Sequence, residues 1–238
     1  MVFNRSIVFL STDTDHHRYL IKKFESKNIS FKKIFFETSS IKPAFQTEPF
    51  EKKKIKKFEK NFFKNFNKKI NLSNVTEVKN INNKKVYNYI KNKKPYICIV
   101  FGTRKIDKKI IDLFKPNGFM INIHRGIMSR YRGLDSDLWA ILEGKKNFVG
   151  ITIHEVEKKL DAGKVFYQKK LKIRSFQIHQ IRYYTTILAV KYLLILIKDI
   201  FAKKKIYKKK IKLGKYYSFM PLNLKKICKK KLKHEKQY

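Results

Sequence analysis

The chain has 238 residues, with 58 Lys or Arg against 18 Asp or Glu, and a formal net charge of +40. A chain of this length forms one large domain, or one domain with a small appendage, and its core needs no disulfide bonds. Its two cysteines, Cys98 in an apolar run and Cys228 among lysines, exclude a disulfide framework and a cysteine-based metal site.

The N-terminal part of the chain predicts a strand, a helix and a second strand. Residues 6–11 are an apolar run rich in β-formers, 17–27 carry apolar residues at helical spacing, and 29–37 are again β-forming. Polar residues 13–15 are suited to cap the helix. This order is typical of a βαβ unit in a parallel sheet.

The alternation of helices and strands continues along the chain. Further helices are predicted at 50–66, 84–93, 107–114, 137–142 and 175–202, and further strands at 75–78, 96–101, 119–123, 149–154 and 164–170. The fold class that follows is α/β and Rossmann-like, with a mostly parallel central sheet flanked by helices. We expect one main domain over 1–174, with 175–238 as a helix and a basic tail that pack on it or extend it.

The longest apolar stretch does not predict a membrane span. Residues 185–202 are interrupted by Lys191 and Lys198, so the stretch is too short and too charged to cross a bilayer. Residues 1–10 lack the pattern of a signal peptide. We therefore expect a cytoplasmic protein with no membrane partner.

The positive charge invites a nucleic-acid interpretation, because a basic surface is the usual footprint of phosphate binding. Most of the charge is lysine, however, spread through nearly every segment together with abundant Asn, Ile and Phe, a composition that A- and T-rich codons produce. Residues 118–168 carry a net charge of only +2. Compositional drift is the simpler explanation, and nucleic-acid binding stays open as the alternative.

Several familiar motifs are missing from the sequence. There is no glycine-rich phosphate loop, no G-x-S-x-G, and no pair of histidines with a third plausible metal ligand. The sequence therefore predicts no metal site. His16, His17, His179 and His234 are interpreted as ordinary histidines.

Asn122 and His124 are the strongest candidates for chemistry. They are two residues apart at the end of a predicted strand, so both side chains project to one face. In a parallel sheet, ligands bind beyond the carboxyl ends of the strands. An amide beside an imidazole there can stabilise an oxyanion and move a proton, or can merely satisfy backbone groups. Gly126 and Gly133 would let the backbone approach a ligand closely.

Asp161 is a second candidate, in a Leu-Asp-Ala-Gly turn before a predicted strand. It is either a turn residue or a carboxylate that orients an imidazole. Spacing alone leaves both readings open.

Five motifs in order resemble a known family. Asn122-Ile-His124, Tyr131-Arg-Gly133, Leu-Trp-Ala-Ile at 138–141, Gly-Ile-Thr-Ile-His at 150–154 and Leu-Asp-Ala-Gly at 160–163 are similar to the formyltetrahydrofolate-dependent formyltransferases. That family includes methionyl-tRNA formyltransferase, glycinamide ribonucleotide formyltransferase and the sugar-nucleotide N-formyltransferases. The ordered resemblance covers about 96–167.

The resemblance implies a role for each matched residue. Asn122, His124 and Asp161 take the three catalytic positions, and His154 matches a histidine beside the active site. The residues implied to bind the cofactor are Phe101, Gly102, Thr103, Arg104, Lys105, Ile106, Glu157 and Leu160. Those implied to bind or support the substrate are Arg125, Gly126, Tyr131, Arg132, Gly133 and His154.

The chain also departs from the family pattern. The family usually has His-Pro-Ser or His-Pro-Gly where this chain has His124-Arg-Gly126, and a proline a few residues on is replaced by Ser129. Because proline fixes φ, we expect the loop to be looser.

The reaction implied is direct transfer of a formyl group from 10-formyltetrahydrofolate, the formyl-donor co-substrate, to a primary amine, with no metal. Asn122 and His124 would stabilise the oxyanion of a tetrahedral intermediate, and Asp161 would hold His124. The runs 131–140 and 214–221 look most like the sugar-nucleotide enzymes, so an amino-sugar nucleotide is the expected acceptor. Methionyl-tRNA is the alternative, and a non-catalytic basic RNA-binding protein on the same fold is a further one. The sequence does not predict the oligomeric state.

Overall fold

A computed structural model describes residues 6–48, 50–63, 72–115, 118–172 and 176–234. The α-helices are α1 (Asp15–Glu25), α2 (Lys52–Phe63), α3 (Lys84–Lys93), α4 (Lys108–Ile111), α5 (Ser136–Leu142), α6 (Ile181–Phe201) and α7 (Leu222–His234). The strands are β1 (Ile7–Ser11), β2 (Lys33–Glu37), β3 (Val75–Val78), β4 (Ile97–Phe101), β5 (Phe119–His124), β6 (Tyr131–Gly133), β7 (Gly150–Glu155), β8 (Val165–Lys170) and β9 (Lys215–Tyr217). Short 3₁₀ turns lie at Leu72–Asn74, Lys146–Phe148 and Ile178–Gln180.

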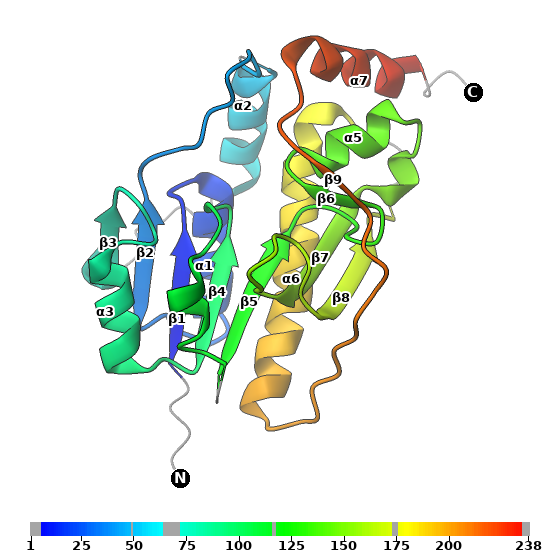
Figure 1. Ribbon diagram of the computed structural model, residues 1–238. Coiled ribbons are helices and arrows are strands. Elements are labelled where there is room, and N and C mark those ends of the chain that lie inside the picture. The colour runs from blue at the N-terminus through cyan, green and yellow to red at the C-terminus, as the bar shows by residue number, and fades with distance from the viewer. Residues whose placement is uncertain (1–5, 49, 64–71, 116–117, 173–175, 235–238) are drawn as a thin grey trace.

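Seven strands form one central sheet in the order β3-β2-β1-β4-β5-β7-β8. The first five in that order pair in parallel, and β7 and β8 are added antiparallel at one side. Figure 1 shows the parallel strands ending at the same edge, beneath α2, α5 and α7. The predicted α/β class with a mostly parallel sheet flanked by helices is confirmed.

Helices cover both faces of the sheet, which explains why β1 and β4 are apolar throughout. Side chains such as Phe9 and Ile99 face one core, shared with α1 and α6. Their neighbours in the strands, such as Val8 and Cys98, face a second core, shared with α3 and α4. Because successive side chains of a strand point to opposite faces, each strand contributes to two separate cores.

Helix α6 is the long apolar helix that the sequence predicts, and its two lysines, Lys191 and Lys198, are exposed as expected. Over the described residues, none of the helices combines the length and apolarity that crossing a bilayer requires.

The segment expected to be a basic tail contains two further elements, β9 and α7. Strand β9 pairs in parallel with β6, and α7 packs against α5. Leu224, Cys228 and Leu232 lie four residues apart and face a third core. This helical spacing is hidden in the sequence by the lysines between them. Cys228 is fully buried, with Sγ 3.3 Å from the Leu138 carbonyl, and is not a tail residue.

Some predicted boundaries differ from the structure. Helix α1 begins earlier than predicted, at Asp15, and has no side-chain cap; the Thr14 hydroxyl contacts the His16 ring instead. Strand β2 begins only at Lys33, and α4 is a single turn. The predicted helix end at 66, the helix start at 175 and the domain boundary at 174 lie outside the described residues.

Candidate active site

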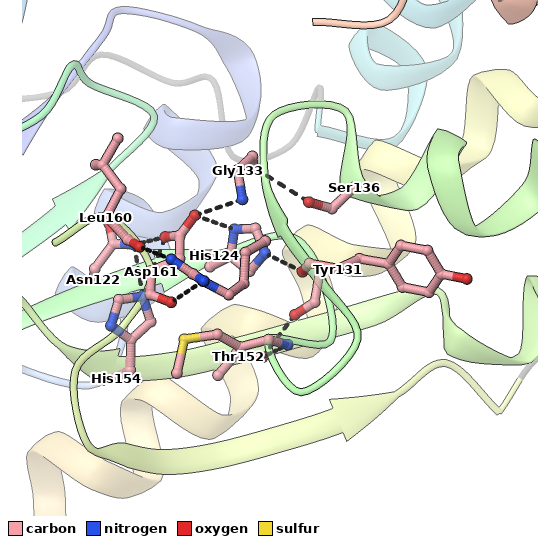
Figure 2. Close-up of polar contacts among 12 residues, drawn as sticks. Asn122, His124, Tyr131, Gly133, Ser136, Thr152, His154, Leu160 and Asp161 are labelled. Carbon is pink, nitrogen blue, oxygen red and sulfur yellow. Dashed lines mark hydrogen bonds and ion pairs between the residues drawn. The ribbon is translucent and has the colours of Figure 1, made fainter. Parts of the chain in front are cut away.

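Strands β5 and β7 place three polar side chains on one face of the sheet. Asn122 and His124 are two residues apart at the carboxyl end of β5, so both project to the same side. The antiparallel register places His154 of β7 directly opposite Asn122, where side chains on one face touch. Nδ2 of Asn122 lies 3.0 Å from Nε2 of His154 (Figure 2).

Asp161 reaches these residues from the loop between β7 and β8. Its backbone is left-handed, with a φ of 44°, which is unfavourable for a residue with a side chain. The Arg132 guanidinium holds this backbone: Nε donates to the Asp161 carbonyl at 2.8 Å, and Nη2 donates to the Leu160 carbonyl at 2.9 Å. Arg132 therefore fixes the direction of the carboxylate.

The Asp161 carboxylate joins the other side chains into one polar cluster, made of Asn122, His124, His154 and Asp161. Oδ2 accepts a hydrogen bond from the Gly133 amide at 2.9 Å and faces Nδ1 of His124 at 3.4 Å. Oδ1 lies 3.4 Å from both Asn122 Nδ2 and His154 Nε2. The structure thus brings together the three residues that the resemblance singles out, with His154 beside them.

The surroundings keep Asp161 ionised. Burial acts to raise the pKa of this carboxyl group. The His124 imidazole, together with the hydrogen bond from the Gly133 amide, acts against burial, and the pKa of Asp161 lies well below its ordinary value. At neutral pH the cluster therefore contains a negative charge.

Both ring nitrogens of His124 face hydrogen-bond acceptors. Nδ1 faces the Asp161 carboxylate, and Nε2 lies 3.0 Å from the Tyr131 carbonyl oxygen. A neutral imidazole can donate to only one of them, whereas an imidazolium donates to both. The geometry suits a positively charged His124, and it differs from the expected one because Nε2 is turned toward Tyr131 rather than toward a reacting oxygen.

His154 orients the amide of Asn122. Its Nδ1 lies 2.6 Å from the Glu155 carbonyl oxygen, which can only accept, so Nδ1 carries the proton. Nε2 is then free to accept from Asn122 Nδ2. This contact points the nitrogen of the amide, rather than its oxygen, at His154.

The loop after His124 is held by side chains in place of the missing prolines. Thr152 Oγ1 donates to the Gly126 carbonyl at 2.7 Å and accepts from the Met128 amide at 3.1 Å. Gln168 accepts from the Ser129 amide at 3.1 Å and donates to the Ser129 hydroxyl at 3.0 Å. Four hydrogen bonds therefore hold this loop against β7 and β8, although the sequence predicted a looser loop.

The two glycines of this loop pack closely against the protein itself, and Gly133 also lines the pocket described below. A side chain at Gly126 would lie 2.4 Å from His124 Nε2, and one at Gly133 would lie 2.1 Å from the Tyr217 carbonyl oxygen. Gly133 also has a φ of +87°, which disfavours other residues.

Tyr131 contributes its backbone to the cluster and not its side chain. The ring points away from the cluster (Figure 2), and the hydroxyl donates to Glu143 at 2.7 Å. Burial and this carboxylate raise the pKa of Tyr131. Tyr131 therefore supports the cluster through its carbonyl, which faces His124, and its role toward a substrate stays a prediction.

A pocket of about 930 Å³ lies beside the polar cluster. We call the part of the pocket formed by residues 101–106 and 156–160 the loop half. The helix half is the part that includes Arg125, Asp137, Arg182 and Lys225. Residues expected to bind the cofactor all line the pocket: Phe101, Gly102, Thr103, Arg104, Lys105, Ile106, Glu157 and Leu160.

The Arg104 side chain is engaged within the protein. Its Nε donates to Glu37 Oε1 at 2.5 Å, and Nη2 donates to the Ser39 hydroxyl at 2.6 Å. Glu37 is buried and also accepts from the Ile81 amide at 2.9 Å. Arg104 therefore fixes the loop, and its charge is already paired.

His16 and His17 line the pocket, although the sequence analysis treated them as ordinary. Nδ1 of His17 lies 2.8 Å from the Thr12 carbonyl oxygen, while its buried Nε2 has no hydrogen-bond partner among the described residues. Burial lowers the pKa of His17 to about 3. One signal was available, since both histidines follow the carboxyl end of β1, where ligands bind in parallel sheets.

Asp137 and Arg182 were also missed as pocket residues. They come from α5 and α6, and their sequence surroundings give no sign that both line one pocket. Over the described ranges, no group of three or more His, Cys, Asp or Glu is arranged to hold a metal ion.

Comparison with known proteins gives a consistent picture. A family model described as formyl transferase matches residues 4–201. Methionyl-tRNA formyltransferase from Borreliella burgdorferi (strain ZS7) is 38% identical over 92 residues, which are 38% of this chain and 28% of that protein. The chain covers less than a third of the length of the curated relatives that it matches first.

Solved structures share the fold. A sugar N-formyltransferase from a Shewanella species has a TM-score of 0.61 at 17% identity, covering 90% of this chain and 76% of that one. HypX from Aquifex aeolicus, solved in complex with tetrahydrofolic acid, has a TM-score of 0.62 at 17% identity, covering 92% of this chain and 30% of that one. At such identities the likeness establishes the fold alone.

Proposed function

Because the chain belongs to the formyl transferase family, we propose that it transfers a formyl group from 10-formyltetrahydrofolate to a primary amine. The observation that carries this proposal is the convergence of Asn122, His124 and Asp161 beside a pocket at the carboxyl end of β5. Its volume is within the range of small-molecule sites. An amide, an imidazole and a carboxylate can together stabilise negative charge on oxygen and move a proton.

The loop half of the pocket fits the formyl donor. Ile106, Val156 and Leu160 supply apolar surface, and the backbone of 101–106 supplies donors and acceptors for a flat heterocyclic ring. Because Arg104 is paired with Glu37, this half presents a fixed loop rather than an unpaired guanidinium. The tetrahydrofolic acid in the HypX structure supports a folate as the ligand of this fold.

In the proposed reaction, the acceptor nitrogen forms a bond to the formyl carbon and the bond from that carbon to N10 of the folate breaks. Negative charge develops on the formyl oxygen, and the Asn122 amide stabilises it by turning toward that oxygen the N–H that faces Asp161 at 3.4 Å in the structure. His124, charged and held by Asp161 and the Tyr131 carbonyl, adds its positive charge nearby. The proton lost by the amine passes to the departing N10 through the cluster or a water molecule.

The Asn122→Ala variant tests this role directly. Removing one donor to a developing oxyanion commonly lowers kcat by about 10²–10³-fold. Formyl transfer is measured with 10-formyltetrahydrofolate and candidate amines, beside a thermal-shift measurement of tetrahydrofolate binding. If Asn122→Ala, His124→Ala and Asp161→Ala all kept wild-type turnover, the proposed catalytic role of the cluster would be wrong.

The acceptor that we propose is an amino group on a sugar nucleotide. Two observations support it. The fold shared with the sugar N-formyltransferase extends over 90% of this chain, and the segment around β9 contributes Tyr216, Ser218 and Phe219 to the pocket. A compact pocket of this kind suits a small molecule.

Methionyl-tRNA is the second candidate acceptor. The net charge of +40 favours it, and so does the relative from Borreliella burgdorferi. A salt series separates the two acceptors. Binding of tRNA should weaken steeply with salt, because each neutralised phosphate adds to the slope, whereas a sugar nucleotide with two phosphates should respond weakly.

A further inference from the structure

The helix half of the pocket is lined by charged side chains from four parts of the chain. Arg125 follows β5, Asp137 lies in α5, Arg182 in α6 and Lys225 in α7. Charges gathered in a pocket are paired with one another or are available to a ligand. The contacts of each one decide which of these applies.

Two of the cations are neutralised inside the protein. Arg182 forms a two-pronged ion pair with the buried carboxylate of Glu59, with nitrogen–oxygen distances of 2.6 and 2.5 Å. Lys225 lies 3.2 Å from Asp135, which also accepts from the Met220 amide at 2.8 Å. Neither side chain needs a ligand to satisfy its charge.

Arg125 is different. Its half-buried guanidinium lines the pocket but makes no hydrogen bond or ion pair with any residue in the described part of the chain. Burial lowers the pKa of Arg125. The Asp137 carboxylate has the largest opposing effect on that pKa, although it does not come within ion-pair distance. An arginine keeps its charge under these conditions. Arg125 therefore carries a positive charge that the protein leaves without a partner.

The neighbouring histidines report the same positive field. Burial is the main reason that the pKa of His16 and His17 is lowered, and the charges of Arg125 and Arg182 lower both further. Both rings are therefore neutral near pH 7, and neither adds a competing charge. At Arg125 itself the carboxylates of Asp137, Glu59 and Asp135 oppose this field, but none of them comes within ion-pair distance of the guanidinium.

We propose that Arg125 is an anion-recognition residue of the acceptor subsite, and that the acceptor amine carries a phosphate group that Arg125 binds. The planar guanidinium presents paired donors that match phosphate oxygens. Arg125 and His124 line the same pocket, so a phosphate bound at Arg125 can belong to a molecule that also reaches the polar cluster. This inference rests on the proposed formyl transfer and assigns to Arg125 the recognition of the phosphate that both candidate acceptors carry.

A binding experiment tests the anion site without turnover. Inorganic pyrophosphate is titrated into the full chain by calorimetry at fixed ionic strength, for wild type, Arg125→Gln and Arg125→Lys. We expect affinity to fall about 10- to 100-fold in Arg125→Gln, the loss typical of a charged hydrogen bond, and less in Arg125→Lys. Acetate serves as the carboxylate probe, and binding of acetate in preference to pyrophosphate would overturn the phosphate assignment.

Arg130→Gln is the matched control, since Arg130 belongs to the same loop, is exposed and lies outside the pocket. Arg130→Gln also removes one positive charge, so any general effect of the basic surface on pyrophosphate affinity will lower the affinity of this variant as well. Equal losses in Arg125→Gln and Arg130→Gln would overturn the proposal. Melting temperatures of all variants identify any that fail to fold, and Arg125→Lys then provides the comparison.

A kinetic experiment adds specificity. With a phosphorylated acceptor, Arg125→Gln should raise KM about 10- to 100-fold, and with its dephosphorylated counterpart it should leave KM unchanged. Equal effects on both acceptors would overturn the proposal. Tetrahydrofolate binding distinguishes a failure of the proposed formyl transfer from a failure of the anion site. If the wild type does not bind tetrahydrofolate, formyl transfer is contradicted. If folate binding is intact but Arg125→Gln binds pyrophosphate as well as the wild type does, the anion site alone is contradicted.

Discussion

The two halves of the pocket satisfy their charges in different ways. In the loop half, the one arginine, Arg104, is paired with Glu37 and holds the loop in shape. In the helix half, Arg182 is paired with Glu59 in the same manner, but Arg125 is left without a partner among the described residues. Under the functions proposed above, one half would recognise its ligand by shape and the other by charge, so substitutions should affect the two ligands separately.

The largest effect is expected where the halves meet. Asp161→Asn keeps the shape of the side chain but removes the negative charge that faces His124. We expect kcat to fall by about 10²–10⁴-fold, because the imidazole loses the partner that holds and charges it. Folate and acceptor binding should change little. Asp112→Asn, at an exposed ion pair, is the control in the same turnover assay; a similar loss in both variants would contradict a specific role.

Glu59→Gln is the next test and concerns the helix half. The change leaves the Arg182 guanidinium without its buried counter-charge. Breaking a buried ion pair costs about 3 kcal/mol of unfolding free energy, whereas an exposed pair costs less than about 1. Urea denaturation of Glu59→Gln and of Glu25→Gln, at a surface pair with Lys22, measures the difference. Equal stabilities would show that Arg182 is not held in this way.

Glu37→Gln makes the corresponding change in the loop half. Arg104 loses its charged partner, and the loop over 101–106 loses its anchor. We expect tetrahydrofolate affinity to fall about tenfold, from the loss of one charged hydrogen bond, with acceptor KM unchanged. Calorimetry with Glu77→Gln, an exposed residue of β3, gives the baseline. A rise in acceptor KM alone would reverse the assignment of the two halves.

At neutral pH the smallest effect is expected at His17, because its protonation changes the free energy of unfolding only in acid. The pKa of His17 is lowered by burial to about 3, against about 6.5 in an unfolded chain. Its contribution to stability is therefore complete above pH 6.5 and is lost as pH falls toward 3. Within that window one proton changes unfolding free energy by about 1.4 kcal/mol per pH unit.

Replacing His17 by Gln should flatten this pH dependence by about one proton. Denaturation of both proteins at pH 7.5 and at pH 4.5 gives the slope. His17 is one of the causes that lower the pKa of His16, so the slope is also measured in His16→Gln and in the double variant. An unchanged slope would mean that His17 titrates normally.

The sheet and half of the site followed from local patterns. Apolar runs identified β1, β4 and β5, because strands covered on both faces read as continuous apolar segments. The two-residue spacing of Asn122 and His124 placed them on one face. The approach of Asp161 could not be predicted in this way, because it depends on the antiparallel β5–β7 register and on Arg132 of β6, which donates to the backbone of a left-handed turn.

The helix half was largely hidden from the sequence. Lysines mask the spacing of Leu224, Cys228 and Leu232, so α7 was taken for a basic tail. The ion pair of Arg182 with Glu59 joins residues 123 positions apart, and no local pattern encodes such a contact. Tertiary contacts between charged residues could not be predicted, because charged residues occur in nearly every segment of this chain.

The pairing of β9 with β6 has a consequence for synthesis on the ribosome. Every strand of the central sheet and the whole polar cluster are translated before Lys215–Tyr217, which close the helix half against β6. The central sheet and the polar cluster can therefore form before β9 pairs with β6 and completes the wall of the helix half.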